Sequence, residues 1–267
     1  ELLGVPEHPL ADFRDFREIL DAFLRQLDHL IEHAVIGTVT AQKLHMEMVP
    51  RPFLSLCVDG CLEKGRDLSR GGARYNVGPV LTGIGLGVAA NGLAAIRKLV
   101  FEDRSASLED LDRALEADWE GYEFLRGQAQ KAPKYGNDDD SVDSLAVEIA
   151  DFYYRRTRNR KDVFGSPFNT AFMGISNYVP MGKPVGALPC GRKAGAPLTE
   201  GVSPYAGSDV STPLAVLRSA AKINHDVHTG GTLLNLRLSR GLLATDQGLR
   251  NLGAMIRAFF SLGAFHV

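Results

Sequence analysis

The chain has 267 residues, of which 45% are hydrophobic and 23% charged, proportions typical of a soluble globular protein rather than a disordered one. Thirty basic and 32 acidic side chains give a net charge of −2, so we expect no surface for nucleic acid. No apolar run approaches the ~20 residues that cross a membrane, so we expect no membrane contact. Three cysteines are too few, and odd in number, for a disulfide scaffold, and they favour a reducing, cytoplasmic compartment.

Two helices are predicted in the first half of the chain, with a strand between them. Apolar residues recur every three or four positions over residues 13–31, which predicts an amphipathic helix. Residues 35–40 are rich in β-branched side chains and predict a short strand or extended segment. Ser107 and Asp110 have the spacing of a capping box, so a second helix should begin there.

The second half alternates helical patterns with loops. A third helix should follow three aspartates at residues 138–140 and end in a basic run, since both ends then complement the helix dipole. Residues 165–207 are rich in glycine and proline and predict strands joined by ordered loops, where functional sites are often built. Thr212 and Pro213 should start a further helix, and the alternation over residues 234–238 predicts a half-buried strand.

A last helix should begin near Thr245 and bury five apolar side chains, namely Leu249, Leu252, Ile256, Phe259 and Phe260. Helices and strands interleaved in this way predict an α/β architecture.

The glycine-rich stretch at residues 83–90 loosely fits the G-x-G-x-x-G/A fingerprint of dinucleotide-binding proteins, with Glu102 or Asp103 as the acidic residue. A charged helix follows, however, and not the second parallel strand that such a unit requires. Close helix packing through glycine is therefore the favoured interpretation, and nucleotide binding stays an alternative.

Several residues could serve as metal ligands, but their spacing matches no complete metal-binding motif. Asp138, Asp139, Asp140 and Asp143 offer oxygen ligands, but helix capping explains them better. Cys57 and Cys61 lie one helical turn apart without two further ligands nearby, since His45, Cys190 and the pair His225 and His228 are distant in sequence. We therefore expect no bound metal.

Several ordered segments resemble the glycyl radical enzyme superfamily, on the dehydratase and lyase branch of the pyruvate formate-lyase-like proteins. They are Pro52-Phe-Leu-Ser-Leu, Gly60-Cys-Leu-Glu-Lys-Gly-Arg-Asp, Gly71-Gly-Ala-Arg-Tyr-Asn, Tyr135-Gly-Asn-Asp-Asp-Asp, Gly191-Arg-Lys-Ala-Gly-Ala-Pro-Leu, Gly230-Gly-Thr-Leu-Leu-Asn and Phe265-His-Val.

The resemblance implies a ten-stranded barrel of two antiparallel five-stranded halves wrapped in helices. This chain would supply roughly the second half-barrel, as a single partial domain over residues 1–267 without the glycine radical domain. In that family a separate activating enzyme, which uses S-adenosylmethionine and an iron–sulfur cluster, installs a glycyl radical. The radical generates a thiyl on a cysteine, which abstracts a substrate hydrogen atom.

Neither radical-bearing segment of that family is expected in this chain: the family's thiyl cysteine lies in a Gly-Cys-x-Glu motif, and its radical glycine lies in a short Arg-Val-x-Gly-Tyr loop. The segment beginning at Gly60 has the spacing Gly-Cys-x-Glu of the thiyl motif, but the resemblance assigns Cys61 to a block downstream of it. Cys190 stands where the family usually has aspartate.

The two ends of the chain suggest a fragment. Because the chain begins at Glu1 and stops at Val267 within an apolar stretch, we expect an interior piece of a longer enzyme, which would be inactive and poorly soluble alone.

The resemblance also suggests where substrate would be contacted. A strand over residues 169–177 should line the barrel, and alternation favours Phe172 and Ser176 as pocket residues, with Phe53 and Ser55 as further candidates. For the aromatic pair, a place in the core is at least as good an interpretation.

The leading hypothesis is that the chain is part of a cytoplasmic enzyme that eliminates water, an amine or sulfite from a small polar molecule. The full-length enzyme is expected to be a homodimer. The alternatives are a non-catalytic binding or structural module that reuses the half-barrel, and a nucleotide-binding protein.

Overall fold

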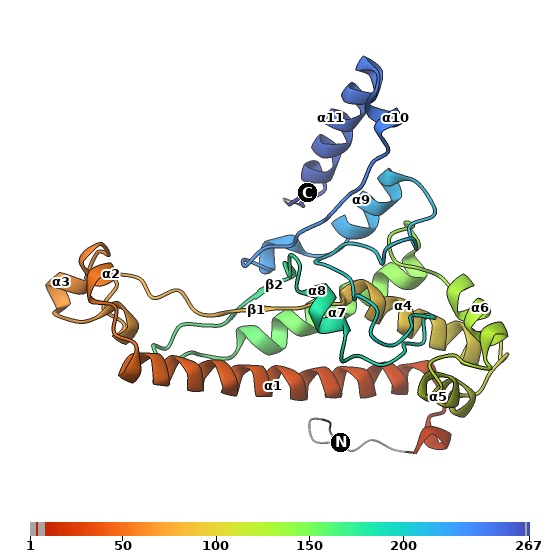
Figure 1. The fold of residues 1–267 in the computed structure, drawn as a ribbon, viewed down its shortest axis with the longest axis horizontal. Helices are drawn as coiled ribbons and strands as arrows, with labels where there is room; N and C mark the ends of the chain where they lie inside the picture. Colours follow the sequence, from red (N-terminus) through yellow and green to blue (C-terminus); the bar gives the residue numbers. More distant parts are fainter. Residues whose placement is uncertain (1–3, 5–8, 265) are drawn as a thin grey trace.

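The computed structural model describes Gly4 and residues 9–264, 266 and 267. The chain is mainly helical, with one small sheet at its centre (Figure 1). The helices are α1 (Phe16–Met48), α2 (Pro52–Leu56), α3 (Cys61–Lys64), α4 (Leu86–Ile96), α5 (Leu108–Glu116), α6 (Glu123–Lys131), α7 (Asp140–Arg158), α8 (Tyr178–Gly182), α9 (Pro213–Ala221), α10 (Arg240–Leu243) and α11 (Asp246–Ser261). The strands are β1 (Val80–Thr82) and β2 (Asn169–Ala171). Three short 3-10 helices are η1 (Leu10–Asp12), η2 (Leu68–Arg70) and η4 (His225–Val227), and η3 (Arg97–Glu102) is a π-helix that directly follows α4.

Helix α1 is longer than the sequence predicts. The amphipathic helix is confirmed, and Asp15 caps it by accepting a hydrogen bond from the Glu18 amide at 3.0 Å. The predicted strand at residues 35–40 is wrong, because these residues continue the helix. Val35 lies one turn after the buried Ile31 and is itself buried, so burial of the apolar stripe outweighs the weak strand preference of β-branched residues.

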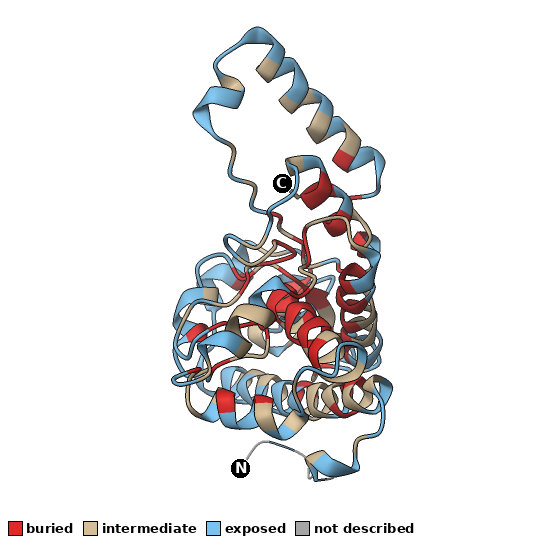
Figure 2. Cartoon of the chain, turned by 90° about the vertical axis from the view of Figure 1, so that its right-hand side faces the viewer, coloured by how far each residue is buried: buried red, intermediate tan, exposed pale blue. Residues whose placement is uncertain are grey.

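The core lies where α1 and α4 pack on α7 (Figure 2). Small side chains occupy the interface between α4 and α7, so the two helix backbones can approach closely. The buried alanines are Ala90 and Ala94 on α4 and Ala146 and Ala150 on α7. The helices predicted at Ser107 and after residues 138–140 are confirmed, as is the start of α9 at Pro213.

The sheet is smaller than the predicted half-barrel. Strands β1 and β2 pair in parallel, with Leu81 opposite Thr170, and Phe172 forms one parallel bridge to Thr232. Within the described residues, three neighbouring segments therefore stand where five strands were expected.

Of two further predicted strands, one is shorter than expected and the other is not formed. Strand β2 ends at Ala171, and Ile175 has a positive φ of 52°, where the chain turns toward α8. Residues 234–238 keep the predicted alternation, with Leu234 fully buried and Asn235 and Arg237 exposed, but they have no strand assignment. Alternation reports which face is buried, while a strand also needs a neighbour for its backbone hydrogen bonds.

Two parts of the chain project from this core. Helices α2 and α3 lie at one end of the molecule, beyond the last turns of α1, and α10 and α11 form an arm on another side (Figure 1). The start of α11 at Asp246 is confirmed, but of its five apolar residues only Phe259 is buried, and Leu249 and Phe260 are about half exposed. Its apolar stripe therefore extends beyond the surface available to cover it.

None of the described helices is apolar over a length that could cross a membrane.

Candidate functional site

Phe172 lies at the centre of the sheet. Its amide donates to the Gly231 carbonyl at 2.7 Å, and its carbonyl accepts from the Leu233 amide at 2.9 Å. The side chain is 3% exposed, and its ring centroid lies 5.5 Å from that of Tyr153 and 4.9 Å from that of His228. Phe172 directly follows β2, and these two backbone hydrogen bonds join it to the segment that follows η4.

Glycines surround Phe172 because nothing larger fits. A Cβ on Gly83 would lie 2.6 Å from the Phe172 ring, and a Cβ on Gly201 would lie 2.9 Å from the Phe172 carbonyl oxygen. Gly201 also has a φ of +53°, a conformation that favours glycine. The glycine-rich stretch therefore serves close packing around the sheet.

Beside Phe172 a buried histidine is held by the sheet. His228 is fully buried, and its Nδ1 is hydrogen-bonded to the Thr170 hydroxyl at 2.8 Å. Its Nε2 is buried and has no hydrogen-bond partner among the described residues. Burial, with a smaller contribution from His225, lowers the pKa of His228 to about 4, so the side chain is neutral at pH 7.

His225 is also buried, but both of its ring nitrogens are in use. Nδ1 is hydrogen-bonded to the Thr232 hydroxyl at 2.6 Å and Nε2 to the Ala220 carbonyl at 2.9 Å. Burial lowers the pKa of His225 as well. The two histidines therefore bind different partners, and no cluster of three or more His, Cys, Asp or Glu side chains suited to a metal occurs in the described part of the chain.

The four predicted pocket residues do not come together. Ser176 is exposed in the turn before α8, near the end of the segment that carries Phe172. Phe53 and Ser55 lie on α2, at a separate end of the molecule (Figure 1). Phe53 is 81% exposed. Ser55 is buried, donates to the Arg51 carbonyl and to Asp67, and accepts from the Leu68 amide, so its hydroxyl already holds that lobe together.

The start of α4 does not provide a phosphate site. The Thr199 hydroxyl accepts hydrogen bonds from the amides of Gly87 and Val88 at 3.0 and 3.4 Å, which are the groups a phosphate would need. The chain then continues through η3 into α5 and not into a second parallel strand. Both observations count against nucleotide binding.

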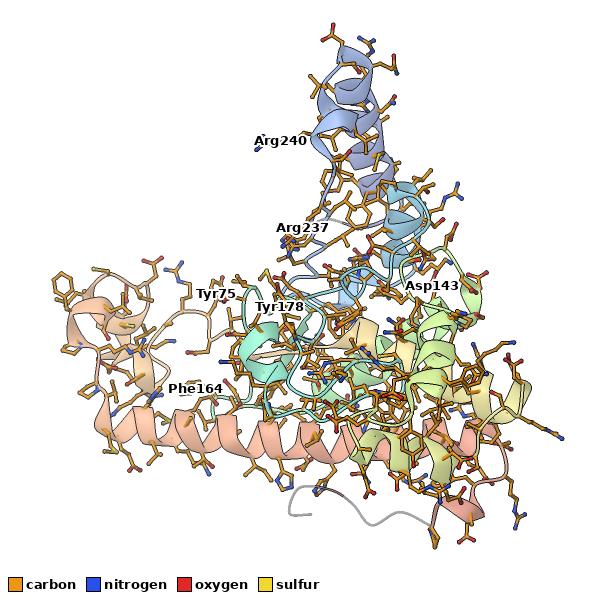
Figure 3. All side chains as sticks on the ribbon, turned by 45° about the vertical axis from the view of Figure 1, so that its right-hand side comes forward. Tyr75, Asp143, Phe164, Tyr178, Arg237 and Arg240 are labelled. Carbon is orange, nitrogen blue, oxygen red and sulfur yellow. The ribbon has the colours of Figure 1, made fainter. Side chains whose placement is uncertain are left out.

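The aspartates after Asn137 cap α7 and anchor α9. Asp139 caps α7 by accepting from the Ser141 amide at 2.9 Å. Asp143 is fully buried at the start of α7 (Figure 3), where Ser219 and Lys222 approach its carboxylate at 2.8 and 2.7 Å. Burial raises the pKa of Asp143, against the opposing effect of Lys222. Lys222 also pairs with Asp138 and Asp140, and these hydrogen bonds raise its pKa although burial opposes them. The capping interpretation is therefore confirmed for Asp139, whereas the other three aspartates bind side chains at the end of α9.

The segment at Gly191 is organised by its arginine. Arg192 is 2% exposed and donates to the carbonyls of Gly182 and Gly186 at 2.9 and 2.7 Å and to those of Val185, Ala196 and Pro197. Its guanidinium therefore fixes the loop over residues 182–197 from within. Cys190, where an aspartate was expected, is buried, and burial raises the pKa of its thiol.

Cys61 has a structural setting. Gly60 has a φ of +96° and donates its amide to Glu63 at 3.0 Å, which closes the first turn of α3. Cys61 is buried there, and Cys57 is exposed. Glu63 thus caps a helix, and α3 lies away from the sheet that holds Phe172 (Figure 1).

Comparison with known proteins identifies the family. A family model described as "Pyruvate formate lyase-like" matches residues 2–182. The chain belongs to this family of glycyl radical enzymes. A second model, "Glycine radical", matches residues 198–267.

The relatives include dehydratases and lyases, among them an isethionate sulfite-lyase of Oleidesulfovibrio alaskensis at 30% identity over 99% of this chain and 32% of that protein. The chain is 36% identical over 266 residues to "Trans-4-hydroxy-L-proline dehydratase" of Clostridioides difficile, covering 99% of this chain and 34% of that protein. It matches the B12-independent glycerol dehydratase of Clostridium butyricum with a TM-score of 0.94 and 35% identity, covering 99% of this chain and 34% of the other. A structure from Roseburia inulinivorans concerning 1,2-propanediol dehydration gives a TM-score of 0.93 at 33% identity, covering 98% and 34%. The chain thus spans about a third of the length of these relatives.

These matches confirm the fold class as part of the glycyl radical enzyme barrel. The glycine radical match disagrees with our expectation that residues 1–267 contain none of that domain, although the Arg-Val-x-Gly-Tyr loop does not occur in the sequence. Of the terminal Phe-His-Val segment, Phe265 lies outside the described residues.

Proposed function

We propose that this chain is part of a glycyl radical enzyme that eliminates water, or another small leaving group, from a small polar molecule. The observation that carries the proposal is the agreement of nearly the whole chain, at 33–35% identity, with the structure of a glycerol dehydratase and with a structure concerning 1,2-propanediol dehydration. A non-catalytic module would not need the sequence features of both family models in their order.

The radical chemistry belongs to the full-length protein in this proposal. The glycyl radical would be installed by an activating enzyme with S-adenosylmethionine and an iron–sulfur cluster, and it would generate the thiyl that abstracts a substrate hydrogen atom. We place neither the thiyl cysteine nor the radical glycine on this chain, which has no catalytic residue in this assignment. We further propose a cytoplasmic homodimer.

In this proposal the chain contributes to the wall of the substrate pocket. Phe172 is the main candidate, because two backbone hydrogen bonds fix it in the central sheet and its ring packs on His228. Ser176 is a second candidate, four residues later on the same segment and exposed. Phe53 and Ser55 are weaker candidates, since they lie on α2 and the Ser55 hydroxyl is occupied by protein groups.

The direct test uses the full-length protein, anaerobically activated and supplied in turn with trans-4-hydroxy-L-proline, glycerol, 1,2-propanediol and isethionate. We expect an organic radical in the electron paramagnetic resonance spectrum and consumption of one substrate class. Residues 1–267 alone, treated identically, should give neither signal. A radical on the isolated piece would refute the assignment, and a full-length protein without any radical would refute the proposed function.

A variant pair tests the role of Phe172. Phe172→Leu should change the relative kcat/KM for two substrates, because it alters the pocket wall. Phe168→Leu is the matched control, since Phe168 is fully buried in the same segment and assigned only to the core. Equal effects of both substitutions on substrate preference would contradict a pocket role for Phe172.

A further inference from the structure

Two histidines one turn apart on α1 have their ring nitrogens side by side. His29 and His33 are separated by four residues, so their side chains lie on the same face of the helix. Their Nε2 atoms are 3.0 Å apart, and their ring planes are nearly perpendicular, at 88°. His29 is half-buried and His33 exposed, so the pair opens on the surface of α1.

At this distance the two imidazoles are hydrogen-bonded to each other, and an ion bound by both Nε2 atoms would replace that hydrogen bond. The separation is also the one that two neighbouring ligands of a six-coordinate or square-planar metal ion adopt. A metal–nitrogen bond of about 2.1 Å with a right angle at the metal places the two nitrogens about 3.0 Å apart. A tetrahedral ion would require about 3.4 Å from the same bond length. The pair is therefore compatible with Ni²⁺ or Cu²⁺ without a large movement of either ring.

The acidic neighbours of the pair are already engaged. Asp28 is paired with Arg156, and Glu32 with Arg160. The spacing His-x-x-Glu-His occurs in one class of zinc peptidases, where the glutamate takes part in the chemistry. Here Arg160 holds that glutamate, and no third His, Cys, Asp or Glu joins the pair among the residues described. The arrangement supports binding of an ion and not peptidase chemistry.

We propose that His29 and His33 form a surface site for a divalent first-row transition-metal ion, with two imidazole nitrogens as protein ligands and water in the remaining positions. Bridging positions i and i+4 would hold the middle of α1 in its helical conformation. Hard ions such as Mg²⁺ prefer oxygen ligands and should not bind this pair.

The test measures Ni²⁺ binding to the chelator-treated full-length protein by calorimetry at pH 7.5. His29→Gln and His33→Gln should each weaken one binding event at least tenfold or remove it. His45→Gln is the matched control, because His45 is an exposed histidine on the same helix and should leave that event unchanged. Glutamine is a good helix former, so α1 should persist in both variants, and circular dichroism checks this.

A crystal soaked in Ni²⁺ should show an anomalous-scattering peak between the two Nε2 atoms. Isotherms that are identical for wild type and both variants would overturn the proposal. The same is true of wild-type protein that binds no Ni²⁺, or of an equal loss on substituting His45.

Discussion

The ion pair between α7 and α9 offers a quantitative test of the packing described above. Lys222 follows the last turn of α9 and contacts the fully buried Asp143 on α7 at 2.7 Å. Replacing Lys222 by methionine keeps most of the apolar stem but leaves a buried carboxylate with Ser219 as its remaining side-chain partner. The interface between the two helices should therefore weaken.

The size of the effect follows from the exposure of the two partners. Removing one partner of a buried ion pair costs about 3–5 kcal/mol. The Lys222 side chain is 28% exposed, so water replaces part of what is lost, and we expect about 2–3 kcal/mol. That corresponds to local opening about 30 to 150 times more frequent, since 1.4 kcal/mol is a factor of ten.

Hydrogen exchange of the full-length protein measures this opening directly. Protection factors of amides in residues 140–146 and 213–221 should fall in Lys222→Met. Arg218→Met is the matched control on the same helix, because Arg218 pairs with Asp138 at 3.2 Å while its side chain is 57% exposed. Its effect should stay below about fivefold. Protection unchanged by Lys222→Met, or lowered equally by the control, would refute the reasoning.

The loss should also depend on pH in a defined direction. Burial already raises the pKa of Asp143 above its ordinary value, and removing Lys222 takes away a group that lowers it. The folded state then keeps a proton on Asp143 at pH values where the unfolded chain has released it, so stability falls as the pH rises through that window. The penalty of Lys222→Met should accordingly be larger at pH 8 than at pH 5.

Three further predictions concern the surroundings of the sheet. Gly83→Ala should destabilise by about 1–3 kcal/mol, because the added methyl would lie 2.6 Å from the Phe172 ring, and thermal melting measures it. Thr199→Val should cost about 1 kcal/mol and speed exchange at the start of α4, whose amides Thr199 caps; unchanged exchange there would contradict the cap. The pKa of His228 is about 4 in the folded chain, below the ordinary value of 6.5. Between pH 4 and 6.5 the unfolded chain therefore binds more protons at this residue than the folded chain does. Stability should thus be lost as the pH falls from 6.5 to 4, and His228→Gln should reduce that slope in melting experiments.

Local patterns predicted the helices well because helix signals are carried by neighbouring residues. The capping box at Ser107 is present as expected, with the Asp110 amide 3.0 Å from the Ser107 hydroxyl. The start of α9 is equally local, since the Thr212 side chain accepts from the Ala215 amide. The strand predicted at residues 35–40 failed because propensity was weighed without the burial of Val35 against the core.

The sheet could be predicted only in part, because its partners are far apart in sequence. Leu81 pairs with Thr170 across 89 positions, and Phe172 bridges to Thr232 across 60. Periodicity marks the buried face of each segment but does not identify its neighbour. The family resemblance supplied the barrel that the periodicity alone did not.

The candidate pocket residues could likewise be predicted only in part, because a sequence pattern does not show which groups a side chain contacts. The sequence offers both Phe172, from strand alternation, and Ser55, as a further candidate within the block at Pro52. The structure places one in the central sheet, while the other holds a peripheral lobe together. Distinguishing the two requires knowing which hydrogen bonds each residue already makes. His29 and His33 show the converse: their four-residue spacing was visible in the sequence, but only the 3.0 Å between their nitrogens makes them a specific candidate for a metal ion. Chemistry can therefore be assigned to a residue type only after its protein partners are known, and the His29 and Phe172 variants test the two assignments independently.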